Sequence, residues 1–385
     1  MKFFVTAMRL VSALVLLFFP VLLPAQQSAV PVPSLPTIAA KAYVLLDFNS
    51  GQFLASHSPS ERVEPASLTK LMTAYLAFAA LRQKTLRPEQ HVPVSAHAWK
   101  AQGSRMFIEP HKPVTVDELI RGMIVQSGND ACIALAEAIA GSEEVFAQMM
   151  TREAQRLGMK NTNFVNSTGL PHSQHYSTAH DLALLAAAIV RDFPEYYPLY
   201  STKEFRYNNI SQSNRNRLLW TDPTVDGMKT GYTENAGYCL ITSAKRDTRR
   251  LISVVLGTAS ESARAIESQK LLNYGFQFYD TVRLYEKDQP VATLQVWKGS
   301  SNTIKAGFTS DFYVSLPKGQ VEKLKANIES MQPLLAPISA GQRVGTMKVT
   351  LDGKPYRELP VVALESVPVA GILGRSWDSI RLLFK

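Results

Sequence analysis

The sequence predicts an α+β fold in which an antiparallel sheet is flanked by helices. A small all-β domain and a C-terminal amphipathic helix are expected to follow it. Three observations lead to this prediction. Runs with helical spacing alternate with strand pairs joined by short turns. The composition changes near residue 282 to short β-like runs, and the last segment carries its apolar residues on one arc. A chain of 385 residues with 46% apolar and 19% charged residues is long enough for two globular domains.

Residues 1–25 have the composition of a secretory signal peptide. Lys2 and Arg9 precede the apolar stretch "LVSALVLLFFPVLLPA", which ends at the small residue Ala25. A retained membrane helix is the alternative, but two prolines in the stretch and the small final residue favour cleavage. We therefore expect an exported protein.

The net charge indicates what kind of surface the protein binds, and the number of cysteines indicates whether it depends on disulfide bonds. The formal charge is +9, and removing the two basic residues of the signal peptide leaves 9 − 2 = +7. A basic exported protein suits an anionic surface such as lipid head groups or cell-wall polymer, and no nucleic-acid module is present. Cys132 and Cys239 are too few for a disulfide framework, so we expect two free, buried thiols.

The first elements follow a Pro-rich extended leader over residues 26–39. Residues 42–58, "AYVLLDFNSGQFLASHS", predict two strands in a hairpin. A helix is expected to start near Ser67, because apolar residues recur at helical spacing from Leu68 to Phe78.

Further helices and one more hairpin complete this domain. The stretch 114–141 predicts two helices broken at Ser127-Gly128-Asn129. Residues 177–194 predict a helix with a capping pattern, and residues 262–282 predict a late helix. Between them, residues 236–258 read as two strands around a charged turn. Helices mixed with hairpins favour an antiparallel sheet.

The last two segments differ in composition from the rest. Short β-like runs and an Asp352-Gly353 turn predict an all-β domain over residues 282–366, after a first domain over 26–281. Residues 369–385 are too short to span a bilayer but fit a helix lying in the membrane interface. The alternative is a terminal helix packed on its own β-domain. The predicted apolar arc comprises Ile372, Leu373, Trp377, Ile380, Leu383 and Phe384.

Three short polar motifs carry the chemistry. In Ser67-x-x-Lys70, a helix would bring the amine to the hydroxyl, and a neutral lysine could remove its proton. Ser127-Gly128-Asn129, at a break between helices, offers a hydroxyl and an amide for proton relay and amide binding. Each motif alone occurs often in ordinary helices and turns.

The third motif is Lys229-Thr230-Gly231, which leads into a strand pattern. Its lysine and hydroxyl could hold a carboxylate, and its glycine lets a substrate backbone approach closely. An ordinary edge strand is the alternative. The three motifs together, 60 and 102 residues apart, form the set typical of penicillin-binding proteins and serine β-lactamases.

The sequence resembles the low-molecular-mass penicillin-binding proteins that are serine-type D-alanyl-D-alanine carboxypeptidases. "PASLTKLMTAY", "SGNDACIALAE" and "DGMKTGYTENAGYCL" look like the three motif regions of that family. The signal peptide, small β-domain and terminal amphipathic helix match its usual layout. The resemblance implies a penicillin-binding/β-lactamase-like fold and removal of the terminal D-Ala from peptidoglycan stem pentapeptides.

The resemblance also implies roles for single residues. Ser67 would attack the carbonyl of the penultimate D-Ala, with Lys70 as the base. Ser127 and Asn129 would pass a proton to the leaving D-Ala and orient the amide. Backbone N–H groups of Ser67 and Tyr232 would form the oxyanion hole.

The carboxylate end of the substrate would bind at the third motif. Lys229 and Thr230 would hold the terminal carboxylate beside Gly231, with Arg264 near it. β-Lactam antibiotics would acylate the same serine. The resemblance implies no metal or cofactor, and the histidines have no zinc-ligand spacing. It further implies a location on the periplasmic face of the bacterial cytoplasmic membrane, held there by the C-terminal helix.

Three other functions compete with this one. A class A β-lactamase would carry Ser-Asp-Asn and a deacylating glutamate before Lys-Thr-Gly, and "KNTNFVNSTGLPHSQHYS" contains none. A D,D-endopeptidase acting on peptidoglycan cross-links has the same motifs. A non-catalytic wall-binding scaffold is disfavoured by the intact motifs.

His172, His175 and His180 are expected to be solvated or to cap a helix.

Overall fold

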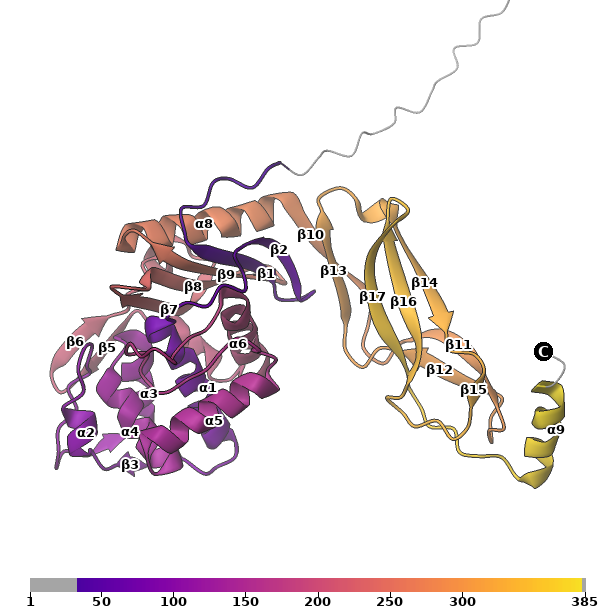
Figure 1. The fold of residues 1–385 in the computed structure, drawn as a ribbon, viewed down its shortest axis with the longest axis horizontal. Coiled ribbons are helices and arrows are strands. Elements are labelled where there is room, and N and C mark those ends of the chain that lie inside the picture. The colour runs from indigo at the N-terminus through magenta and orange to yellow at the C-terminus, as the bar shows by residue number, and fades with distance from the viewer. Residues whose placement is uncertain (1–32, 383–385) are drawn as a thin grey trace, which may run out of the picture. The chain divides into compact units, whose positions relative to one another are not determined.

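The computed structural model describes residues 33–382. The predicted signal peptide, most of the predicted leader, Leu383 and Phe384 lie outside these residues. Within the described part, a five-stranded antiparallel sheet has the order β2-β1-β9-β8-β7 (Figure 1). Its strands are β1 (Ala42–Asp47), β2 (Gln52–His57), β7 (Val225–Thr233), β8 (Gly237–Arg246) and β9 (Arg249–Thr258).

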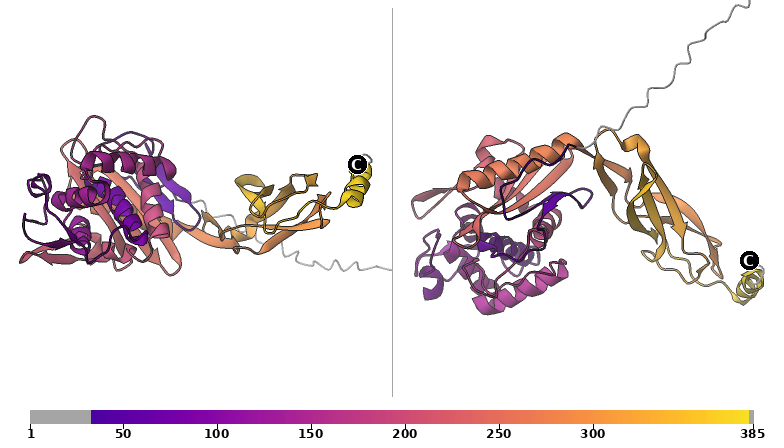
Figure 2. Two further views of the ribbon diagram at one scale, coloured as in Figure 1. Left: turned by 90° about the horizontal axis from the view of Figure 1, so that it is seen from below. Right: turned by 45° about the horizontal axis from the view of Figure 1, so that its top comes forward.

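The sheet is buried on both faces because its central strands are apolar throughout. In β1, Tyr43 and Leu45 pack against helix α8 (Glu261–Phe278), and the apolar cluster that they form includes Leu271 of α8. Val44 and Leu46 point to the other face, toward α1 (Lys70–Arg82) and α6 (Ala179–Asp192). Figures 1 and 2 show α8 along one face and helices α1, α3, α4, α5 and α6 on the other.

The remaining elements of this domain surround the second face, except the short helix α7, whose Leu218 and Leu219 join the cluster under α8. They are η1 (Ala66–Thr69), β3 (His91–Val92), α2 (Ala96–Trp99), β4 (Val114–Thr115), α3 (Val116–Val125), α4 (Asn129–Ala140), α5 (Glu143–Arg156), η2 (Tyr197–Ser201), β5 (Glu204–Tyr207), β6 (Ile210–Ser213) and α7 (Leu218–Thr221).

Both predicted hairpins are confirmed, as β1–β2 and β8–β9. The break between helices at residues 127–129 is confirmed as well, because α3 ends at Val125 and α4 begins at Asn129. The late helix was predicted to reach Val282, and this is wrong. It ends at Phe278, and Tyr279 starts a strand that pairs with β13, which satisfies its backbone groups there.

The chain from β10 to β17 forms an all-β domain built around its own apolar core. β10 pairs with β13, and the larger sheet has the order β14-β16-β17-β12-β11-β15. The predicted limits of this domain, 282 and 366, stay predictions. Its elements are β10 (Tyr279–Tyr285), β11 (Pro290–Trp297), β12 (Thr303–Gly307), β13 (Phe312–Pro317), η3 (Val321–Lys323), β14 (Leu324–Ser330), β15 (Leu334–Leu335), β16 (Arg343–Leu351) and β17 (Lys354–Ala363).

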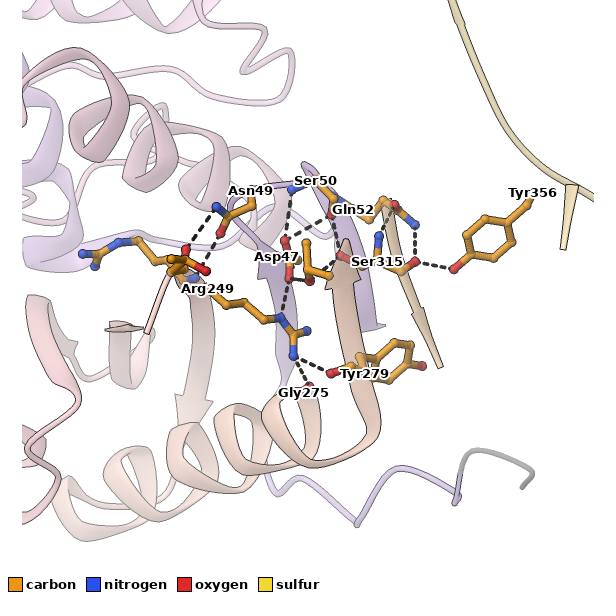
Figure 3. A network of polar contacts seen from close by, with 12 residues as sticks. Asp47, Asn49, Ser50, Gln52, Arg249, Gly275, Tyr279, Ser315 and Tyr356 are labelled. Atoms are coloured by element: carbon orange, nitrogen blue, oxygen red, sulfur yellow. Dashed lines mark hydrogen bonds and ion pairs between the residues drawn. The ribbon is translucent and has the colours of Figure 1, made fainter. Parts of the chain in front are cut away.

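A polar junction joins the β-domain to the first sheet (Figure 3). Asp47, at the end of β1, is fully buried, and its two oxygens accept four hydrogen bonds. The donors are the Ser50 amide and hydroxyl, Arg249 Nε at 2.9 Å and the Thr281 hydroxyl at 2.5 Å. The Ser50 hydroxyl also lies 2.6 Å from that of Ser315 in β13.

Helix α9 (Ile372–Leu382) follows the β-domain. Its apolar side chains are exposed, with 88% of Leu373 and 64% of Trp377 accessible to solvent. Its one recorded side-chain bond to the β-domain runs from the Lys298 amide to Asp378 Oδ2, at 2.6 Å, in the part of the helix the structure describes. The apolar face of α9 is therefore exposed, and both the interfacial helix and the alternative of a terminal helix packed on its own β-domain stay predictions. Across residues 33–382, no helix has the length and apolarity needed to cross a bilayer.

Candidate active site

Ser67 lies in the short turn η1, directly before helix α1. A regular α-helix was expected from this point, but residues 66–69 form a tighter 3₁₀ turn, as helix N-termini often do. Lys70 is the first residue of α1, and its Nζ lies 3.0 Å from Ser67 Oγ. The turn therefore brings the amine and the hydroxyl into contact.

Lys70 is buried and forms no recorded ion pair with any residue that the structure describes. Only 1% of the residue is exposed, and its ammonium donates to the Thr168 carbonyl oxygen at 2.6 Å. Burial lowers the pKa of Lys70 below its ordinary value, and the nearby positive charge of Arg215 adds to this effect. A lysine in this environment can be neutral and act as a base.

Ser127 stands between α3 and α4 in a left-handed conformation, with φ of 66°. The residue is 3% exposed, and its hydroxyl has no hydrogen-bond partner within the described part of the chain. Buried hydroxyl groups are nearly always bonded, so this one is available to a ligand. The Asn129 side-chain amide donates to the Gln102 carbonyl at 2.6 Å, which leaves its oxygen free to accept.

Strand β7 brings the third motif to the same cleft. Lys229 is 4% exposed and donates to the carbonyl of Thr230 at 3.1 Å. Burial lowers the pKa of Lys229 well below its ordinary value, and the charges of Lys70 and Arg215 lower it further. Gly231 is tightly packed, because a Cβ there would lie 3.2 Å from the Pro65 carbonyl oxygen.

Arg264 reaches the cleft from α8. It is 5% exposed, lies 3.4 Å from the Gly231 carbonyl and 3.5 Å from Glu261. Tyr232, by contrast, is 51% exposed at the mouth. The cleft holds about 480 Å³ and is lined by Ser67, Gly103, Ser104, Ser127, Asn129, Thr168, Gly169, Leu170, Arg215, Thr230, Gly231, Tyr232, Thr233, Tyr238, Glu261 and Arg264. The structure therefore brings seven of the predicted residues to its wall, with Lys70 and Lys229 buried directly beside them.

One wall of the cleft, the turn from Asn166 to Leu170, was not predicted from the sequence. The Asn166 side-chain oxygen accepts the Gly169 amide at 2.7 Å and the Thr168 amide at 3.2 Å, which fixes the turn. A Cβ at Gly169 would lie 1.8 Å from the Ala66 carbonyl oxygen. Gly169 is required because it packs against a backbone carbonyl group, and a search for side-chain motifs does not detect such a contact.

Arg215 was also missed. It is exposed at the cleft and forms no recorded ion pair among residues 33–382. The buried side chains of Asn214 and Asn216 bond to the Thr202 and Gly227 carbonyls and hold the backbone on both sides of it. Asparagine-flanked arginine is a common pattern, so sequence alone could not single it out.

The expectation for His175 is wrong. The residue is 3% exposed rather than solvated. Its Nδ1 accepts the Val165 amide at 3.1 Å, so its Nε2 carries the hydrogen and donates to the Thr69 hydroxyl at 2.8 Å. Burial lowers the pKa of His175 to about 4. The neutral ring therefore supports the turn that carries Ser67.

Comparison with known proteins assigns the chain to a family. A family model described as D-alanyl-D-alanine carboxypeptidase matches residues 27–260. The chain belongs to this family. A second model, described as the C-terminal domain of penicillin-binding protein 5, matches residues 279–369.

Relatives and solved structures agree with the assignment to this carboxypeptidase family. D-alanyl-D-alanine carboxypeptidase DacC of Escherichia coli is 42% identical, covering 97% of this chain and 94% of the relative. Penicillin-binding protein 5 from Haemophilus influenzae is 41% identical with a TM-score of 0.83, covering 86% and 98%. Penicillin-binding protein D2 from Listeria monocytogenes, in an ampicillin-bound form, is 29% identical with a TM-score of 0.55, covering 63% and 98%.

The predicted fold class and enzyme class are thereby confirmed. This carboxypeptidase has the α+β catalytic domain and the all-β C-terminal domain of the penicillin-binding protein 5 type. It is a serine hydrolase with D-alanyl-D-alanine carboxypeptidase activity. The two cysteines are free and buried, as expected, and burial raises the pKa of Cys132 to about 12.

Proposed function

We propose that Ser67 is the nucleophile and that Lys70 is its base. The observation that carries this proposal is the 3.0 Å contact between Ser67 Oγ and the buried amine of Lys70. Neutral Lys70 takes the hydroxyl proton while Ser67 Oγ attacks the carbonyl of the penultimate D-Ala, and the peptide bond to the terminal D-Ala breaks. Water then hydrolyses the acyl-enzyme.

The terminal carboxylate binds to the cations around β7. Lys229, Thr230 and Arg264 offer two charged donors and a hydroxyl beside the cleft. Because Lys70 and Lys229 repel each other inside one buried site, the pair favours a single proton. A bound carboxylate attracts that proton to Lys229, which leaves Lys70 neutral and ready to act.

The remaining groups serve the leaving amine and the developing oxyanion. The unpartnered hydroxyl of Ser127 passes a proton to the nitrogen of the departing D-Ala. The free amide oxygen of Asn129 orients the substrate amide. The backbone N–H groups of Ser67 and Tyr232 stabilise the oxyanion, and Gly231 leaves room for the substrate backbone.

The substrates are peptidoglycan stem pentapeptides that end in D-Ala-D-Ala. β-Lactams present a strained amide and a carboxylate with similar spacing and acylate the same serine. The ampicillin-bound form of the Listeria monocytogenes relative supports this inference.

The test is release of D-alanine from a stem pentapeptide by the full chain and by Ser67→Ala. We expect release by the wild type and none above background by the variant. Ser268→Ala is the matched control, because this buried serine also lacks a hydrogen-bond partner among the described residues but does not line the cleft. Release that persists in Ser67→Ala would contradict the proposal. Release only from cross-linked peptides would favour the endopeptidase.

We also propose that α9 holds the exported protein on the periplasmic face of the cytoplasmic membrane. Ile372, Leu373, Trp377 and Ile380 expose an apolar face without a protein partner in the described chain, and Arg375 and Arg381 supply positive charge. Deleting residues 369–385 should release the protein from anionic lipid vesicles while D-alanine release continues. Continued attachment of the shortened protein would contradict this proposal.

A further inference from the structure

The carboxylate of Asp130 collects four backbone N–H groups. Asp130 is the second residue of α4 and is 1% exposed. Its Oδ1 accepts from the amides of Met106 and Ala131, each at 2.9 Å. Its Oδ2 accepts from the amides of Phe107 at 2.8 Å and Ile108 at 3.2 Å. Three of these donors belong to a segment far from α4 in the sequence, so the carboxylate joins two separate parts of the chain.

That segment forms one wall of the catalytic cleft. Gly103 and Ser104 line the cleft, and the residues after them are those held by Asp130. The backbone amide of Asn129 donates to the Ser104 carbonyl at 2.7 Å, and the Asn129 side-chain amide donates to the Gln102 carbonyl. Asn129 and Asp130 therefore clamp this wall at successive points.

The clamp holds strained backbone on both sides. Phe107 has φ of 68° and Ser127 has φ of 66°, a conformation that is unfavourable for a residue other than glycine. A Cβ at Gly128 would lie 2.8 Å from Asp130 Oδ1 and 3.1 Å from the Met106 nitrogen. The turn that carries Ser127 thus packs directly on the carboxylate.

We propose that Asp130 is a positioning residue of the carboxypeptidase reaction. It holds the Ser127 turn against residues 102–108, so that the Ser127 hydroxyl and the Asn129 amide oxygen face the scissile bond. Asp130 does not line the cleft and does not touch the substrate. The inference rests on the roles proposed above for Ser127 and Asn129.

Its charge also acts on the base. Asp130 raises the pKa of Lys70 and so opposes the lowering by burial. Removing this charge lowers the pKa of Lys70 further, and the rise of activity with pH moves to lower pH. If Asp130 had a purely structural role, the pH at which activity rises would not change in the variant. The other titratable groups around Lys70 are Cys132, Glu143, His175, Arg215 and Lys229.

The chain offers a matched control in Asp181. It is 2% exposed, lies near the start of α6 and accepts the Asn161 amide and the Thr162 hydroxyl, both at 2.8 Å. It does not line the cleft. Asp130→Asn and Asp181→Asn remove the same charge from equally buried sites, so both should lower the melting temperature.

The experiment measures D-alanine release and penicillin acylation by the full chain against pH. For Asp130→Asn we expect kcat to fall on the order of 100-fold with little change in KM, since displaced reacting groups lose about this much. The acid side of its profile should move to lower pH, and Asp181→Asn should keep wild-type kcat and profile. Asp130→Asn with wild-type kcat and profile, and only a loss of stability, would overturn the proposal.

A second variant covers the case in which Asp130→Asn does not fold. Gly128→Ala pushes the carboxylate away but keeps its charge, so kcat should fall while the acid side of the profile stays. Wild-type kcat in folded Gly128→Ala would overturn the proposal. Ser127→Ala distinguishes failure of the role proposed for Ser127 from failure of the role proposed for Asp130. If Ser127→Ala keeps wild-type kcat, the proton-transfer role of Ser127 fails. The Asp130 variants test only whether Asp130 positions the turn.

Discussion

The catalytic cleft and the domain junction both bury charged groups, but they treat them in opposite ways. At the junction, Asp47 accepts four hydrogen bonds and faces Arg249 (Figure 3). In the cleft, Lys70 donates to the Ser67 hydroxyl and a carbonyl group, Lys229 donates to a carbonyl group, and no carboxylate forms a recorded ion pair with either one among residues 33–382. Buried charge that is paired stabilises a fold, whereas buried charge left unpaired costs stability and is available to a substrate.

This difference suggests that changes in the two regions should have opposite consequences. A change at the junction should reduce stability and leave the chemistry of folded molecules intact. A change in the cleft should abolish chemistry with little loss of stability.

The largest effect is expected for Lys70→Met. Loss of the proposed base should slow penicillin acylation on the order of 10⁴-fold. The melting temperature should not fall, because an apolar side chain replaces a buried amine. Acylation rates and thermal unfolding of the same preparation check both statements. If Lys70→Met loses stability and keeps its acylation rate, Lys70 serves the fold rather than the chemistry, which would contradict the difference drawn between the cleft and the junction.

Asp47→Ala comes next and should behave in the opposite way. It leaves Arg249, whose side chain is only 14% exposed, without its carboxylate, and breaking a buried pair costs about 3–5 kcal/mol. Urea unfolding measures this loss. The rate of D-alanine release per folded molecule should equal that of the wild type, and a reduced rate would mean that the junction acts on the cleft.

Lys229→Gln should weaken the use of substrates with a free terminal carboxylate. Losing a charged hydrogen bond in a buried site costs about 3 kcal/mol, which is roughly 100-fold in kcat/KM. A peptide whose terminal carboxylate is amidated should react slowly with both proteins and equally so. If the variant discriminated between acid and amide as the wild type does, the carboxylate would bind elsewhere.

The smallest effect concerns His175 and pH. Its pKa is about 4 in the folded protein and ordinarily 6.5, so the unfolded chain binds the proton more readily. Stability is therefore complete above pH 6.5 and is lost as pH falls toward 4, by roughly 3 kcal/mol at most. His175→Gln should flatten this part of the curve of unfolding free energy against pH. A curve of unchanged slope would exclude His175 as its source.

The sequence allowed most of the fold to be predicted because apolar spacing and turn residues are local signals. The β1–β2 hairpin, the break at residues 127–129 and the α6 cap at Thr178 follow from them. The end of α8 did not, since the residues from Tyr279 onward continue a helical spacing and are drawn into pairing with β13. The residue at which such a helix ends depends on contacts with other elements of the fold.

Parts of the site escaped prediction for a related reason. Motifs report side chains that act, whereas the Thr168 carbonyl acts through its backbone. Arg215 and His175 are distant in sequence from the motifs and reach them only through folding. The four amides on Asp130 are likewise a product of two segments that meet.

The most direct test of this account is the pH dependence of penicillin acylation at Ser67 in the wild-type protein. The account holds that burial lowers the pKa of Lys70 and favours a neutral base, so the acylation rate constant should rise with pH and level off below the ordinary lysine pKa of 10.5. A rate constant that still rises in proportion to hydroxide near pH 10.5 would mean that Lys70 keeps an ordinary pKa, and the central claim would fail.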